Sequence, residues 1–177
     1  MTDRTTPPAL HIIDNFDFPD PMFFRLDNGV PVYGFNNGTQ DIIKIDFLFD
    51  AGSWHQQQPL TARYTSRMLS EGTENYSAFE IAGRLDSMGI ALSNFAMKDS
   101  SLVSVSMLSK HFGNIMPLIN EIINQPAFPE KELGIQKYYG KQIFIDDSLK
   151  VNEQAMRYFA NQLFGDAHPY GKMITAE

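Results

Sequence analysis

The clearest pattern in the chain is an alternation of apolar and polar positions in residues 41–50. In this segment, DIIKIDFLFD, every second position from Ile43 to Phe49 is apolar, and charged residues lie between several of them. A period of two places the apolar side chains on one face of a strand, so we expect a strand with one buried face here. Residues 102–108 alternate in the same way, and residues 91–97 precede them across a short polar turn. These two segments are therefore predicted to pair as a hairpin.

A second hairpin is predicted near the beginning of the chain. Residues 23–35, FFRLDNGVPVYGF, place Asn28 and Gly29 between two apolar runs. Asn and Gly readily adopt the positive φ angles of a tight turn, which favours two short paired strands. Residues 1–21 mix proline, aspartate and asparagine with isolated apolar residues, so we interpret them as an N-terminal arm or a loose leader. A single domain is then expected over residues 22–177.

Helical spacing of apolar residues predicts five helices. The second follows Ser77, a suitable N-cap residue, and Glu80 lies three positions on, as in a capping box. The third carries an apolar stripe that we expect to be core: Phe112, Ile115, Ile119 and Ile122. Two prolines end that helix. The five predicted helices cover residues 59–69, 78–88, 112–123, 130–147 and 151–163.

The order of these elements indicates the fold class. Strands and helices come in runs and do not alternate regularly, which favours an α+β fold, with helices packed on one face of a largely antiparallel sheet. The sequence ends without a strand that would close such a sheet, so we expect a truncated lobe of a longer protein. Apolar faces left uncovered in such a lobe would favour self-association.

Composition and charge exclude several classes of function. The 177 residues are 43% apolar, which suffices for one domain with a real core. A net charge of -7 disfavours binding to nucleic acid, and the absence of cysteine excludes thiol chemistry. No apolar run approaches the length of a membrane span. As written, the chain is expected to be cytoplasmic, or periplasmic if a leader was removed.

Five short motifs are spread across most of the chain. They are LDNGVPV at 26–32, AGSWHQ at 51–56, MLSEGTENYSAFEIAGRLDSMG at 68–89, NQPAFPEKEL at 124–133 and HPYG at 168–171. In this order and at this spacing they resemble the first lobe of the inverted-motif zinc peptidases, the pitrilysin, insulinase and mitochondrial-processing-peptidase family. The resemblance implies a zinc-peptidase lobe, an interpretation that agrees with the predicted α+β fold.

In that family the catalytic zinc depends on a helix that carries H-x-x-E-H. Two histidines four residues apart bind Zn²⁺, the glutamate acts as general base, and a later helix supplies a further ligand. The resemblance places Arg63 and Arg67 at the two histidine positions and Ser66 at the position of the base. Gln142 is the best match for the remaining ligand.

These substitutions predict that the chain binds no zinc and has no catalytic residues of this kind. A guanidinium offers no lone pair to a metal and adds positive charge beside it. A serine hydroxyl cannot relay a proton at neutral pH as a carboxylate does. No cofactor is therefore expected, although the family binds zinc.

The four histidines do not suggest a replacement metal site. His11, His55, His111 and His168 are scattered, and no two share a helix face. Ser66 is also a weak candidate for a nucleophile, because no histidine or lysine is placed near it on its helix and the G-x-S-x-G motif is absent.

The like-charged pair Arg63 and Arg67 requires an anion, because two cations one helical turn apart destabilise a helix. Two interpretations stay open. Local carboxylates or water satisfy the pair, or the pair lines the former active-site cleft and binds a carboxylate of a partner or peptide. The local candidates are Glu71, Glu74, Glu80 and Asp86.

Substrate contacts are suggested by Asn94, Phe95 and Ala96. The resemblance places at Asn94 an asparagine that helps to hold the substrate backbone, and a peptide added to a sheet edge needs no metal. The alternative is that Asn94 simply ends a strand. Trp54, beside Gly52 and Ser53, is expected to be a core residue.

The predicted function is that of a non-catalytic homologue of zinc metallopeptidases. Its expected partner is an active, zinc-bearing homologue or a second lobe of the same protein, with which it encloses a peptide substrate. Two alternatives remain: an active metalloendopeptidase with unrecognised ligands, and a peptide-binding or scaffold domain without a peptidase partner.

Overall fold

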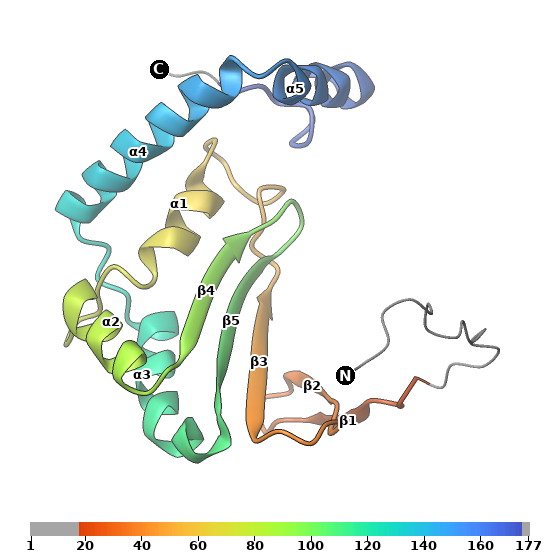
Figure 1. Cartoon of the computed structure of the whole chain (residues 1–177). Coiled ribbons are helices and arrows are strands. Elements are labelled where there is room, and N and C mark those ends of the chain that lie inside the picture. The colour runs from red at the N-terminus through yellow and green to blue at the C-terminus, as the bar shows by residue number, and fades with distance from the viewer. Residues whose placement is uncertain (1–17, 175–177) are drawn as a thin grey trace, which may run out of the picture. The chain divides into compact units, whose positions relative to one another are not determined.

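A computed structural model of the chain describes residues 18–174, and contacts divide the chain into two units with a boundary between Gln40 and Asp41. The described part of the first unit is a hairpin of β1 (Met22–Arg25) and β2 (Pro31–Gly34) (Figure 1). Gly29 adopts a positive φ of 85° in the turn, and the side-chain oxygen of Asn28 accepts a hydrogen bond from the Val30 amide at 3.1 Å. The predicted hairpin is confirmed. The arm proposed for residues 1–21 lies mostly outside the described residues, and the boundary at residue 22 stays a prediction.

An antiparallel sheet forms the centre of the second unit. It contains β3 (Ile42–Phe49), β4 (Ala91–Ala96) and β5 (Ser101–Leu108) in the order β3-β5-β4. Val105 lies opposite Ile45 on one side and Leu92 on the other, so these three side chains share a face. The alternation in the sequence thus becomes one apolar face and one more polar face.

Helices α1 to α3 cover the apolar face of the sheet (Figure 1). A short 3₁₀ turn, Ser109–His111, leads from β5 into α3. The helices in chain order are α1 (Thr61–Met68), α2 (Ala78–Ser87), α3 (Phe112–Asn124), α4 (Glu130–Ser148) and α5 (Val151–Phe164). Both ends of each helix agree with the predicted ends to within two residues.

The core lies between the sheet and helices α2 and α3. Ile115, Ile119 and Ile122 are fully buried in a cluster that includes Val103 and Val105 of β5, whereas Phe112 at the start of α3 is 43% exposed. The predicted stripe is therefore core except at Phe112, the first residue of α3. The remaining buried apolar residues of this cluster are Ile81, Leu85, Ile90, Val103, Val105, Met107 and Leu118.

Polar contacts fix where α2 begins. Ser77 Oγ accepts a hydrogen bond from the Glu80 amide, while the Glu80 carboxylate accepts one from the Ser77 amide at 2.9 Å, which confirms the predicted capping box. In the loop before α2, Thr73 is buried and donates a hydrogen bond to the Glu121 carboxylate on α3 at 2.5 Å. This loop is thereby tied to the helix beneath it.

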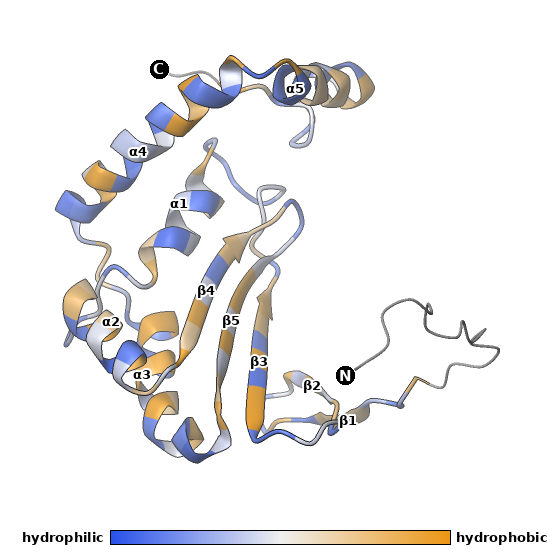
Figure 2. Ribbon diagram, in the orientation of Figure 1, coloured by the Kyte–Doolittle hydropathy of each residue, from blue (hydrophilic) through white to orange (hydrophobic). Residues whose placement is uncertain are grey.

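Helices α4 and α5 contribute no fully buried residue. Figure 2 shows hydrophobic positions on both helices, and several of them are exposed. No helix within residues 18–174 is both long and apolar enough to cross a membrane.

Candidate functional site

Helix α1, which carries the residues that the resemblance places at the zinc motif, lies between β4 and α4. It begins after Leu60, whose φ of 69° is left-handed, and the side-chain oxygen of Gln56 accepts a hydrogen bond from the amide of Ala62 in its first turn at 3.2 Å. Ala62, Ser66 and Met68 form its buried side, while Arg63 and Arg67 are half-buried. The three substituted positions therefore have different surroundings.

Ser66 faces the sheet and lines a pocket of about 350 Å³ that also contains His55. Its Oγ is buried and has no hydrogen-bond partner within residues 18–174. The structure thus brings His55, which lies in the loop before α1, to the same pocket as Ser66, an arrangement that the sequence did not predict. No hydrogen bond joins the two side chains in the described part of the chain, so the contact that activates a serine nucleophile is missing.

Arg63 and Arg67 form no ion pair with any carboxylate in the described region. Burial and the charge of Arg63 lower the pKa of the Arg67 guanidinium below its ordinary value, although it stays charged. Among the carboxylates considered from the sequence, Glu71 accepts a hydrogen bond from Gln136 at 2.9 Å and Glu80 is engaged in the capping box. The two arginines therefore stay available for an anion.

Helix α4 contacts α1 at Gly140. A Cβ at this position would lie 2.4 Å from the hydroxyl of Tyr64, so glycine lets the two helices come together. Gln142 is exposed and lies on nearly the opposite side of α4, because two residues turn a helix by about 200°. The structure therefore does not bring Gln142 to the side of α4 that faces Arg63.

The three residues suggested for substrate binding lie on β4, an edge strand of the described sheet. Asn94 pairs with Val103 and so points to the helix-covered face, where its amide donates a weak hydrogen bond to Ser70 Oγ at 3.4 Å. The amide oxygen of Asn94 is buried without a partner among residues 18–174. Ala96 points to the same face, whereas Phe95 points to the other and is 52% exposed.

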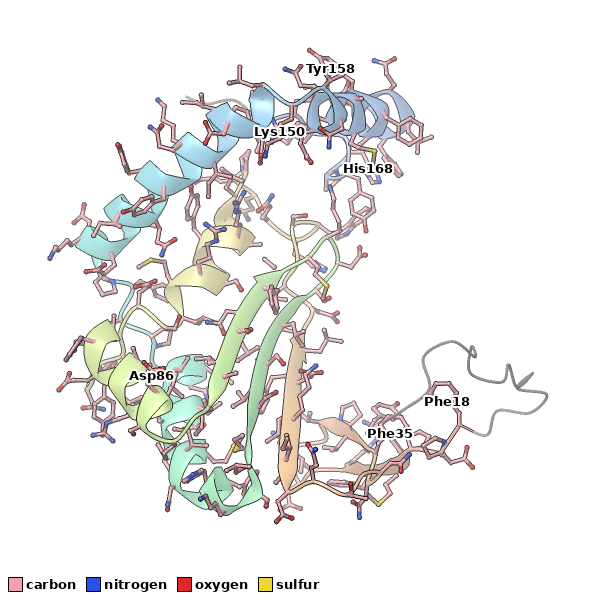
Figure 3. The ribbon with its side chains drawn as sticks, in the orientation of Figure 1. Phe18, Phe35, Asp86, Lys150, Tyr158 and His168 are labelled. Carbon is pink, nitrogen blue, oxygen red and sulfur yellow. The ribbon has the colours of Figure 1, made fainter. Side chains whose placement is uncertain are left out.

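Trp54 lies in an aromatic cluster that joins two of the motifs. Its ring meets the rings of His168 and Tyr170 edge-on, with centroids 5.0 and 5.6 Å apart, and Phe164 at the end of α5 stacks on His168. Figure 3 shows His168 on the turn next to α5. Trp54 is 46% exposed, so the prediction that it is a core residue is wrong. It contacts a surface turn because the turn after α5 folds back over the loop between β3 and α1.

The same cluster is fastened to the turn between β4 and β5. The Tyr170 hydroxyl donates a hydrogen bond to the Asp99 carboxylate, and Lys98 lies 5.1 Å from the Tyr170 ring centroid. The amide of Trp54 donates a hydrogen bond to the Lys98 carbonyl at 2.7 Å. Three segments far apart in sequence are thus held together at one end of the sheet.

No group of three or more potential metal ligands from His, Asp and Glu is found among residues 18–174. His168 contacts Trp54, the residue before His55, whereas His111 follows β5 in the short 3₁₀ turn and His11 lies outside the described residues. The absence of zinc therefore stays a prediction. It is supported by Arg63 and Arg67 on α1, because a guanidinium offers no lone pair to a metal.

The structure also reveals residues that the sequence did not single out. Lys137 and Lys141 line, together with Arg63, a pocket between α1 and α4. Their spacing of four residues in KYYGK places them on one side of α4, but the sequence does not show which side faces α1.

Comparison with known proteins agrees with the resemblance seen in the motifs. Residues 34–156 match the family described as insulinase, peptidase family M16. The chain is 22% identical over 152 residues to an uncharacterised zinc protease of Rickettsia bellii, an alignment that covers 85% of this chain and 37% of that protein. The fold matches the crystal structure of a peptidase M16 inactive domain from Pseudomonas fluorescens with a TM-score of 0.82 and 23% identity, covering 88% of this chain and 38% of that one.

The chain thus spans less than two fifths of the length of these relatives. The likeness to the solved structure establishes the fold, and the family match extends over more than half of the chain. From its motifs, its fold and this match, the chain belongs to the insulinase family of peptidases, M16.

Proposed function

We propose that this domain is a non-catalytic M16 domain that completes the peptide-binding chamber of a zinc-bearing homologue. The single observation that carries the proposal is the chemistry of α1. Two guanidinium groups, Arg63 and Arg67, stand where the resemblance places zinc ligands, and neither forms an ion pair with a described carboxylate. Ser66 stands in place of the general base.

Hydrolysis by the family's mechanism would need both a Lewis acid and a proton acceptor. Arginine supplies neither, since it stays protonated and has no lone pair for a metal. The solved relative from Pseudomonas fluorescens is described as an inactive domain, which supports the proposal by analogy.

Peptide binding does not require the metal. Strand β4 is an edge strand of the described sheet, and an extended peptide can pair with such an edge through main-chain hydrogen bonds. Asn94, with a buried amide oxygen that no described group satisfies, is the side chain on β4 that we propose helps to hold a bound peptide.

The test is to measure zinc content and peptide cleavage on the full-length protein, alone and with a zinc-bearing M16 homologue from the same cell. We expect less than stoichiometric zinc and no cleavage by the protein alone. Adding it to the homologue should raise cleavage above that of the homologue by itself. The homologue with its catalytic glutamate replaced by glutamine serves as the control and should stay inactive.

Stoichiometric zinc together with cleavage by the protein alone would support the alternative of an active metallopeptidase and overturn the proposal. A metal-free protein that neither binds peptides nor co-purifies with a zinc peptidase would support the scaffold alternative.

A further inference from the structure

A pocket of about 670 Å³ lies between α1 and α4 and has a positively charged lining. Its lining contains three cationic side chains, Arg63, Lys137 and Lys141, and no aspartate or glutamate among the described residues. This is unusual for a chain with a net charge of -7. The rest of the wall is mostly apolar, from Pro59, Leu60, Met68, Phe128, Leu133 and Phe144.

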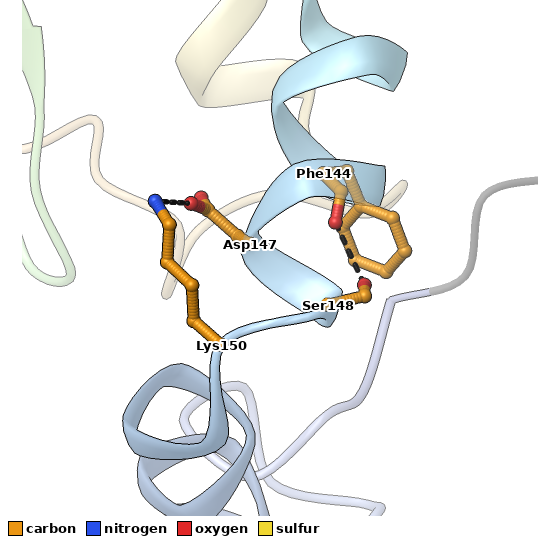
Figure 4. A network of polar contacts seen from close by, with 4 residues as sticks. All are labelled: Phe144, Asp147, Ser148 and Lys150. Atoms are coloured by element: carbon orange, nitrogen blue, oxygen red, sulfur yellow. Dashed lines mark hydrogen bonds and ion pairs between the residues drawn. The ribbon is translucent and has the colours of Figure 1, made fainter.

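These cations are not neutralised within the described part of the chain. None of the three takes part in an ion pair there. The carboxylate whose field reaches Arg63 is Asp147, at the end of α4, but it already binds Lys150 at 2.8 Å (Figure 4). Because Arg67 lies one turn from Arg63 and is partly desolvated, it adds to the positive potential of α1.

The start of α1 increases this potential further. Its first turn contains no acidic residue, although the amide of Ala62 already donates a hydrogen bond to the side-chain oxygen of Gln56 at 3.2 Å. The N-terminal end of a helix carries a partial positive charge, which attracts anions. Leu60 precedes this turn and lines the pocket, so the helix end and the cations lie around the same cavity.

Backbone strain is concentrated at this pocket. Among residues 18–174, the non-glycine residues with positive φ are Leu60, at 69°, and Phe128, at 47°. Both line the pocket, although they come from different loops. Such conformations cost free energy and tend to persist where the surrounding structure shapes a binding site.

We propose that this pocket binds an acidic residue of a peptide, with the carboxylate at Arg63, Lys137 and Lys141 and a neighbouring apolar side chain against the apolar wall. The volume falls in the range of ligand pockets and exceeds the needs of a simple inorganic anion. Its lining of cations beside apolar side chains complements a peptide that carries an aspartate or glutamate next to an aliphatic or aromatic residue. The proposal rests on the proposed function and names the class of peptide that the domain selects.

The test is selection from a randomised peptide library on the immobilised full-length protein. We expect enrichment of aspartate or glutamate beside an apolar residue. A selected peptide should bind about tenfold more weakly after its acidic residue is replaced by the matching amide. The double variant Lys137→Gln/Lys141→Gln should lose most of this preference for the acidic form.

Lys131→Gln is the matched control, because Lys131 belongs to the same helix, is exposed and does not line the pocket. It should keep the full preference. Enrichment without acidic residues, or a preference that survives the double variant, would overturn this inference and leave the proposed function in place. Binding of inorganic phosphate without any preference for acidic peptides would also overturn it. Failure to enrich any peptide would contradict the proposed function as well.

Discussion

At the scale of single residues, Glu121 makes the stability of the fold depend on pH, because its carboxylate holds the loop before α2 against α3. Its carboxylate accepts hydrogen bonds from the Thr73 hydroxyl at 2.5 Å and the Asn75 amide at 3.2 Å. The Thr73 hydrogen bond is the main reason that the pKa of Glu121 lies below its ordinary value. The ionised form is therefore favoured in the folded state, and its contribution to stability is complete above the unfolded-state pKa, about 4.3 for glutamate.

We predict that Glu121→Gln lowers stability at pH 7 and makes the loss of stability shallower as the pH falls from about 5 to 3. The direction follows because the stabilising ionised form is lost as the pH falls through the folded-state pKa. Urea denaturation at several pH values measures it. The control is Glu74→Gln, because Glu74 is exposed and lies in the loop that Glu121 contacts. An equal effect of Glu121→Gln and Glu74→Gln on stability would contradict the prediction.

Gly52 allows a close contact between two backbone segments because it has no side chain. A Cβ at Gly52 would lie 2.4 Å from backbone atoms of Lys98, Asp99 and Ser100. We predict that Gly52→Ala destabilises the protein by about 3 kcal/mol, because the backbone of the β4–β5 turn would have to move. Gly83→Ala, in α2 with open space around it, should instead stabilise by about 0.5–1 kcal/mol. Thermal unfolding of the two variants tests both signs.

At the scale of elements, the turn after α5 is held by the cluster around Trp54. This is the sole tryptophan in the sequence, so its fluorescence reports on the contact without interference. We predict that His168→Ala shifts the Trp54 emission to longer wavelength and lowers stability by about 1 kcal/mol, because edge-on and stacked ring contacts are lost. His111→Ala, next to α3, should leave the emission unchanged, and a similar shift there would refute the assignment.

At the scale of the whole molecule, α5 presents an apolar stripe that the described residues do not cover. Val151, Met156, Phe159 and Leu163 are between 61% and 84% exposed and lie within about half of the helix circumference. Exposed stripes of this kind favour association. The relatives that the chain matches are longer than it, and additional chain packed on α5 would cover the stripe.

We therefore predict that the 177-residue chain, prepared by itself, self-associates at micromolar concentrations. The triple variant Met156→Gln/Phe159→Gln/Leu163→Gln should shift it towards monomer. Light scattering after size-exclusion chromatography measures the mass, and circular dichroism checks that the helices persist. An unchanged mass distribution with intact helices would show that another surface is responsible.

Much of the fold could be predicted from local patterns in the sequence. The alternation in residues 41–50, the Asn-Gly turn and the capping box of Ser77 and Glu80 each depend on neighbours in sequence, and the structure confirms them. The α+β class and the family also followed from elements and motifs in order. Trp54 was misplaced, because exposure depends on what lies across the loop and the local sequence carries no such information.

Only part of the candidate site could be predicted from the sequence. Arg63, Ser66 and Arg67 could be assigned to one helix from spacing, but their different surroundings depend on the rotation of α1 against the sheet and α4. Gln142 was chosen by motif position, and the rotation of α4 turns it away from α1. Helix rotation is set by close packing at a few points, such as Tyr64 against Gly140, which no single segment encodes.

The sequence by itself determined the types of element and the apolar face of the sheet, and it led to the prediction that α1 binds no zinc, because each depends on side chains within a few turns or strand residues of one another. The tertiary structure alone decided that Lys137 and Lys141 face Arg63 across a pocket, and that His168 reaches Trp54. These contacts join segments more than 70 residues apart in the sequence, and their geometry is fixed by packing throughout the second unit.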